Sequence, residues 1–142
     1  MKYSFGTIKV EAEVQGDDRE EVTTLSHIRE RYSHLQGKQK EHLYAVYLNN
    51  DNKVIGDKLI SLGQSMQTSL DVKDIVRTAV LTDASAVILV HNHPSGNCSP
   101  TGSDLTATEK VQTALETFGV SLLDHIIISR KDCHSMKQEG EL

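Results

Sequence analysis

The residues best suited to chemistry lie in one short segment, residues 91–104. His91 and His93 stand two positions apart at the end of an apolar run, and alternate residues of an extended backbone point to the same side. Neutral imidazole is a favoured zinc ligand. Asp104 follows a loop that holds both prolines of the chain, and such a loop can return so that the carboxylate meets both histidines. The segment therefore predicts a metal site with His91, His93 and Asp104 as ligands.

Three protein ligands leave one tetrahedral position for water, which is the pattern of catalytic zinc sites, whereas structural sites are closed by four protein ligands. Bound zinc lowers the pKa of that water toward about 7 and polarises a carbonyl oxygen. A hydrolase of this kind also needs a carboxylate that moves protons. One alternative stays open: a His-x-His pair alone is a weak signal, and single histidines are often ordinary surface or hydrogen-bonded residues.

Two other interpretations of the motif fail on residue type and spacing. Zinc nucleobase deaminases use His-x-Glu with a later Pro-Cys-x-x-Cys, but the residue two after His91 is a histidine and the chain has no Cys-x-x-Cys. The letters of residues 91–93 also spell the name of the HNH nucleases, in which the three residues are dispersed over a ββα unit. The contiguous triplet is therefore no evidence for a nuclease.

Strand and helix patterns alternate around this segment. Short runs that are apolar on both faces are typical of central strands, and apolar residues at helical spacing indicate amphipathic helices. We expect strands at 43–48, 53–62, 86–90 and 122–128, and helices at 72–80 and 105–118. The order predicts an α/β domain with a central mixed β-sheet flanked by helices.

The first residues are expected to form an appendage to this core. Apolar residues alternate with charged ones over residues 8–14, which predicts a half-buried strand. Apolar side chains then recur at helical spacing over residues 22–35, and Gly37 is suited to ending that helix. We therefore predict a strand and helix appendage over 1–36 and a single domain over 37–142.

Composition narrows the classes of function. The chain has 142 residues, the size of one compact domain. A net charge of −5 argues against binding duplex DNA through a basic face, and 4 % aromatic residues argue against stacking on single strands. The longest apolar run is far too short for a membrane span, and the first residues lack a signal-peptide core, so we expect a cytoplasmic protein. Two cysteines cannot make a disulfide framework.

The motif as a whole resembles a known family. His-x-His-Pro, followed at fixed offsets by a hydroxyl residue and Asp104, with a glutamate ahead of an apolar strand, resembles the JAMM (MPN-type) metalloproteases. The sequences of residues 91–96 (HNHPSG) and 122–128 (LLDHIII) resemble the RadC-like branch of that family. The resemblance covers about residues 39–142. This resemblance implies a deaminase-like α/β/α layered domain and one zinc ion per chain, held by His91, His93 and Asp104.

The resemblance also implies two catalytic residues. Glu41, directly before the strand expected at 43–48, would take a proton from the zinc-bound water and hand it to the leaving amine. Otherwise Glu41 is a solvent-facing residue or a salt-bridge partner within the charged cluster at 38–40. Thr101 stands where the family has a serine that stabilises the oxyanion. It is equally interpreted as an ordinary hydroxyl at the start of a helix that Ser103 would cap.

Three further residues near the motif have open roles. Cys98 lies in the loop between the ligands, where it is either a competing fourth ligand or a residue that faces solvent. Asp124 and His125 interrupt an apolar strand. A carboxylate there can orient a zinc-binding histidine from behind, although hydrogen bonds that stabilise the sheet explain both residues as well.

We therefore expect a zinc-dependent metallohydrolase that cleaves an amide or isopeptide bond of a peptide or protein through a metal-activated water. Two alternatives stay open: a non-catalytic binding module of the same fold, and a protein of DNA repair or mobile elements that acts on nucleic acid. RadC-like proteins usually carry a helix-hairpin-helix region, and the first 35 residues lack its Gly-x-Gly turn, so DNA binding is not carried over. A partner protein or a second copy of the chain is expected to help capture the substrate. No membrane partner is expected.

Overall fold

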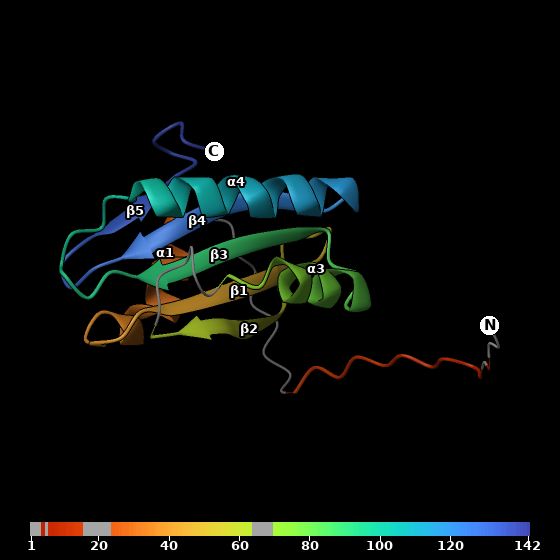
Figure 1. Ribbon diagram of the computed structural model, residues 1–142. Helices are drawn as coiled ribbons and strands as arrows, with labels where there is room; N and C mark the ends of the chain where they lie inside the picture. The colour runs from red at the N-terminus through yellow and green to blue at the C-terminus, as the bar shows by residue number, and fades with distance from the viewer. Residues whose placement is uncertain (1–3, 5, 16–23, 64–69) are drawn as a thin grey trace.

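A mixed β-sheet of five strands forms the centre of the computed structural model, which describes residues 4, 6–15, 24–63 and 70–142 (Figure 1). The strands are β1 (His42–Leu48), β2 (Val54–Leu62), β3 (Ala86–Asn92), β4 (Ser121–Ile128) and β5 (Cys133–Ser135). The helices are α1 (Leu25–Arg31), α3 (Val72–Leu81) and α4 (Gly102–Thr117), with a 3-10 turn, η1 (Ser33–Leu35). The expected α/β class and the mixed sheet are confirmed.

The strand order in the sheet is β2-β1-β3-β4-β5. β1 pairs with β2 and with β3 in antiparallel fashion, β3 and β4 are parallel, and β5 returns antiparallel to β4. A parallel pair needs a crossover connection, which α4 supplies between β3 and β4. The start of α4 is thereby brought to the end of β3, where the histidines lie.

Helices cover both faces of the sheet. On one face, α3 and α4 contribute Ile75, Val111 and Leu115 to a buried cluster with alternate residues of the central strands, such as Tyr47 and Leu89. On the other face, α1 and η1 bury three large side chains against the intervening residues of the same strands. Those three side chains are Ile28, Tyr32 and Leu35. Because both faces are covered, β1 is largely apolar over residues 43–48 and β3 is apolar over residues 86–90.

The pairing of β3 with β4 contains one irregularity. Val87 pairs with Leu122 and Ile88 pairs with Asp124, so Leu123 is an extra residue on β4. An extra residue reverses the alternation of side chains beyond it. Leu122 packs in the buried cluster under α3 and α4, whereas Ile126 packs in the buried cluster under α1 and η1. His125 is thereby turned toward α4.

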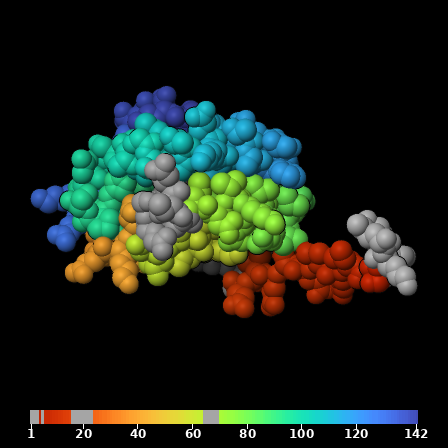
Figure 2. Space-filling model, viewed as in Figure 1, coloured from red at the N-terminus to blue at the C-terminus, as the bar shows by residue number. Residues whose placement is uncertain are grey.

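The N-terminal region differs from the expectation. Residues 6–15 are extended but form no strand pairing among the described residues, and they are exposed; Ile8 is 87 % accessible. Figure 2 shows this segment outside the body of the protein. The half-buried strand expected at 8–14 is therefore wrong. The helix expected at 22–35 is present as α1 and η1, with residues 22 and 23 outside the described part, and the boundary at residue 36 stays a prediction.

α3 begins where a polar side chain satisfies a free backbone amide. The Asp71 carboxylate accepts a hydrogen bond from the Asp74 amide at 3.0 Å and caps α3.

Of the helices in the described ranges, none is both long and apolar enough to cross a membrane.

Candidate metal centre

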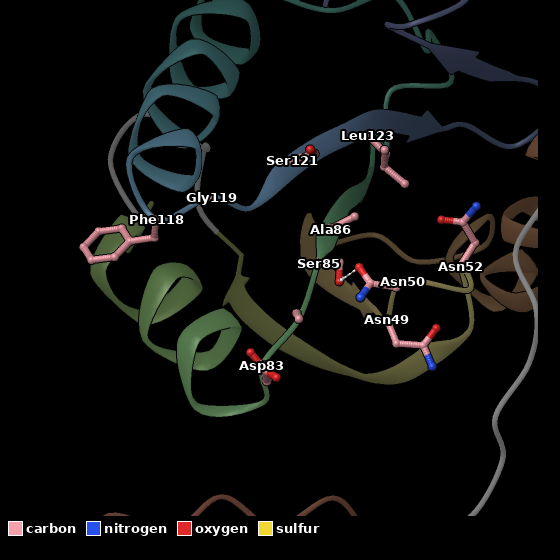
Figure 3. Close-up of a pocket in the computed structure, with 11 residues that line it drawn as sticks. Asn49, Asn50, Asn52, Asp83, Ser85, Ala86, Phe118, Gly119, Ser121 and Leu123 are labelled. Carbon is pink, nitrogen blue, oxygen red and sulfur yellow. Dashed lines mark hydrogen bonds between the residues drawn. The ribbon is translucent and has the colours of Figure 1, made fainter.

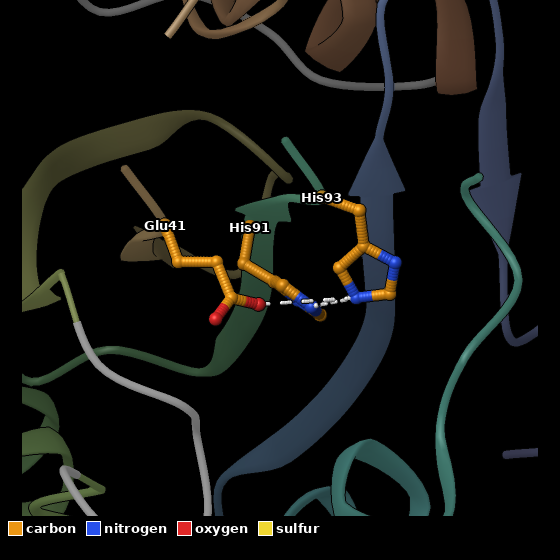
Figure 4. Close-up of side chains that lie close together, drawn as sticks. All are labelled: Glu41, His91 and His93. Atoms are coloured by element: carbon orange, nitrogen blue, oxygen red, sulfur yellow. Dashed lines mark hydrogen bonds and ion pairs between the residues drawn. The ribbon is translucent and has the colours of Figure 1, made fainter. Parts of the chain in front are cut away.

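Three separate elements bring the candidate site residues to one end of the sheet. β3 carries His91, and its continuation carries His93, whose amide still donates to the Ile128 carbonyl of β4 at 2.9 Å. Leu43 of β1 pairs with His91, so Glu41, just before β1, lies next to the end of β3. Figure 4 shows the Glu41 carboxylate and both imidazoles pointing toward one another. α4 presents Asp104 from its first turn.

The ligand atoms of these residues converge. The Nε2 atoms of His91 and His93 are 2.8 Å apart, and Oδ2 of Asp104 lies 3.0 Å from Nε2 of His93. Its other oxygen, Oδ1, lies 3.5 Å from Nε2 of His91. Glu41 Oε1 is 4.0 Å from Nε2 of His93. One ligand atom each of Glu41, His91 and His93 lies within 4.8 Å of the others.

The protonation of His93 shows why these atoms suit a cation. Nδ1 of His93 lies 2.8 Å from the Asn97 carbonyl oxygen, which can only accept, so Nδ1 carries the hydrogen. The neutral ring therefore points the lone pair of Nε2 at the Asp104 carboxylate and at a second imidazole. Buried electron-rich atoms held this close need a shared proton or a cation. Two imidazole nitrogens and a carboxylate oxygen are zinc ligands, so the residues fit the metal.

The electrostatics of the site keep Asp104 ionised. Burial by itself would raise the pKa of this carboxyl, but the His91 and His93 rings that contact it outweigh burial and hold the pKa well below its usual range. For His93, burial would lower the pKa, yet the Asp104 carboxylate beside it and the Asn97 carbonyl raise it. The site thus holds a negative charge at Asp104 with little access to solvent.

Thr101, not Ser103, caps α4, which corrects the expectation from the sequence. The Thr101 hydroxyl accepts from the Asp104 amide at 3.2 Å, and the Asp104 carboxylate accepts from the Thr101 amide at 2.8 Å. This reciprocal pair is a capping box. It fixes the Asp104 side chain from the helix side while the two histidines contact it from the sheet side. The cap uses Thr101 as an acceptor, which does not consume its hydroxyl hydrogen.

Asn92, which the sequence reasoning did not single out, holds the backbone on both sides of Glu41. Its Oδ1 accepts from the His42 amide at 2.6 Å, and its Nδ2 donates to the Lys40 carbonyl at 3.0 Å. The side chain is buried on the face of β3 opposite to His91. The available signal was an asparagine between the two histidines, at the end of an apolar run.

The open roles near the motif are now partly resolved. The Asp124 carboxylate accepts from the Ser135 hydroxyl at 2.5 Å and the Lys137 amide at 3.0 Å, so it anchors the turn after β5. It does not orient a ligand. His125 does contact the site, with Nε2 2.6 Å from Nδ1 of His91. Cys98 is a free thiol and is not among the grouped candidate ligands of the described residues.

A pocket of about 550 Å³ lies at the opposite end of the sheet, where β3 and β4 begin. Its walls are mainly polar, with the Ser85 hydroxyl bonded to Asn50 and the Phe118 side chain at the rim (Figure 3). None of the candidate metal ligands lines it. The chemistry described above therefore belongs to the other end of the sheet.

Comparison with known proteins agrees with this geometry. The family model described as RadC-like JAB domain matches residues 20–141. A UPF0758 protein of Streptococcus suis (strain 98HAH33) is 39 % identical over 105 residues, covering 74 % of this chain and 43 % of that protein. A UPF0758 protein of Streptococcus pyogenes serotype M49 (strain NZ131) is 35 % identical over 121 residues, covering 85 % of this chain and 54 % of that protein. The chain spans about half the length of these curated relatives. The chain belongs to the RadC-like JAB domain family.

Proposed function

We propose that this protein is a zinc-dependent hydrolase that cleaves an amide or isopeptide bond in a peptide or protein. The observation that carries the proposal is the convergence of two buried imidazole Nε2 atoms and the Asp104 carboxylate beside a second, more accessible carboxylate. His91, His93 and Asp104 would hold the metal. A zinc ion held there supplies an acidic water and polarises the carbonyl under attack.

The two carboxylates have different surroundings, and this supports different roles. Asp104 is 3 % exposed, contacts both imidazoles and is fixed by the capping box, as suits a metal ligand. The Glu41 side chain is 29 % exposed and lies farther from His93. Glu41 is therefore the group that can receive a proton at Oε1 from the attacking water and deliver it to the departing amine.

Asn92 and Thr101 support the two catalytic roles. Asn92 binds the backbone on either side of Glu41, which limits the positions that the Glu41 carboxylate can reach. The Thr101 hydroxyl retains its hydrogen and stands beside Asp104, so it is suited to donate to a developing oxyanion. In this proposal Glu41 moves the proton and Thr101 stabilises charge.

The first test is elemental analysis of the protein purified without added metal, together with His93→Ala, Asp104→Ala and Glu41→Gln. We expect about one zinc per chain in the wild type and in Glu41→Gln, and none in the two ligand variants. A wild type that takes up no zinc at neutral pH, even when zinc is supplied, would overturn the metal site.

The second test is hydrolysis. Zinc-loaded wild type and Glu41→Gln are incubated with fluorescently labelled casein and with a mixed peptide library, and new amino termini are detected by mass spectrometry. Cleavage by the wild type that is lost in Glu41→Gln supports the proposal. Equal cleavage by both proteins would overturn the role of Glu41. A fully loaded wild type that cleaves neither casein nor any peptide of the library would favour a non-catalytic binding module.

A further inference from the structure

His125 is a buried group that the proposed reaction does not use. It is fully buried in β4, behind His91, and both of its ring nitrogens have partners. Nε2 lies 2.6 Å from Nδ1 of His91, and Nδ1 lies 2.6 Å from the Thr108 hydroxyl of α4. The extra residue Leu123 in β4 is what turns His125 toward α4.

The direction of the hydrogen bonds follows from counting protons. The Thr108 hydroxyl donates its single hydrogen to the Asp104 carbonyl at 2.6 Å, so toward His125 it accepts. Nδ1 of His125 therefore carries a hydrogen, and Nε2 of the neutral ring accepts from Nδ1 of His91. His91 then has its lone pair on Nε2, the atom that faces His93 and Asp104.

The opposite direction would disable His91. If the Thr108 hydroxyl donated to Nδ1 of His125, the hydrogen of His125 would lie on Nε2. Nε2 of His125 would then donate to Nδ1 of His91. His91 would then carry its hydrogen on Nε2, and a protonated nitrogen has no lone pair for a metal. The backbone carbonyl of Asp104 accepts the Thr108 hydrogen and thereby sets the direction that leaves a lone pair on Nε2 of His91. The side chain of the same residue is a candidate metal ligand.

We propose that His125 and Thr108 are positioning residues that hold His91 in the tautomer with its lone pair on Nε2, so that His91 can bind the metal. This proposal rests on the zinc site proposed above. Partners behind a ligating histidine fix its tautomer and ring orientation, and their loss typically weakens metal binding about 10–100-fold.

The matched substitutions are Thr108→Val and Thr108→Ser, because valine has nearly the shape of threonine without the hydroxyl and serine keeps the hydroxyl without the methyl group. Zinc affinity is measured by competition with a chelator, and circular dichroism confirms that each variant is folded. We expect Thr108→Val to bind zinc about 10–100-fold more weakly and Thr108→Ser to bind it nearly as the wild type does. Equal affinity of folded Thr108→Val and wild type would overturn the proposal.

A second measurement reads the tautomers directly. Long-range ¹H–¹⁵N NMR of the zinc-loaded wild type should place the hydrogen on Nδ1 in both His91 and His125. A hydrogen on Nε2 of His125 would overturn this inference alone, because zinc would still be bound. A wild type without zinc would overturn both the metal site and this inference, so the two failures are distinguishable.

Discussion

The amide of Asn92 should contribute measurably to stability because it joins the end of β3 to the backbone around Glu41. Asn92→Ala removes two hydrogen bonds, of 2.6 Å to the His42 amide and 3.0 Å to the Lys40 carbonyl. Asn92 is 1 % exposed, and both hydrogen bonds are partly buried. At about 0.5–1.5 kcal/mol for each bond, the substitution should lower the free energy of unfolding by about 1–3 kcal/mol.

The assay is urea unfolding of the metal-free protein at neutral pH, followed by circular dichroism. Asn92→Asp is the matched control, because it keeps the acceptor for His42 but turns an oxygen toward the Lys40 carbonyl, and it should be destabilised at least as much as Asn92→Ala. Both variants should retain zinc and hydrolyse the substrate more slowly, since one or both of the bonds from residue 92 to the backbone around Glu41 are lost. A loss below about 0.5 kcal/mol in Asn92→Ala would refute the reasoning, because one ordinary hydrogen bond already contributes that much.

Three further predictions follow from the site and the core. Zinc at about 100 times its dissociation constant should raise the free energy of unfolding by about 2.7 kcal/mol, and chelation should reverse this gain in the wild type while changing nothing in Asp104→Ala; urea unfolding measures both. Cys98→Ser should retain the zinc content of the wild type in elemental analysis, whereas a loss of metal would make the thiol a ligand. Burial and the hydrogen bond to Asp57 raise the pKa of Tyr32, so the folded state favours the protonated phenol, and this stability is complete below about pH 10 and declines above it. Tyr32→Phe should therefore reduce the decline in unfolding free energy between about pH 10 and 11, and an unchanged slope would contradict the assignment.

The sequence predicted the central elements well where burial imposes a period. β1 and β3 are apolar on both faces because helices cover both, and α3 and α4 show the spacing of amphipathic helices. The grouping of His91 and His93 followed from the alternation of side chains at a strand end. β5 escaped notice because three residues are too few to show a period.

The errors have local physical causes. Residues 8–14 alternate like a half-buried strand, but alternation does not provide a neighbouring strand, and the described segment pairs with none. Thr101 and Ser103 both offer a capping hydroxyl, and only the fold of the loop decides that Thr101 bonds the Asp104 amide. Asp124 was as plausible as His125 for contacting a ligand, because an extra residue in a strand leaves no mark in the sequence pattern.

The extra residue Leu123 reconciles two demands on one strand. Leu122 packs under α3 and α4, and His125 faces Thr108 of α4 on the same side, although residues three positions apart lie on opposite sides of a regular strand. If β4 paired regularly from Val87 onward, Asp124 would lie opposite Leu89, where His125 now stands, and His125 would turn to the other face of the sheet. The register of β4 is therefore as informative as the ligand motif: a slip of one residue would leave every candidate ligand in the chain but break the row that joins Thr108, His125 and His91.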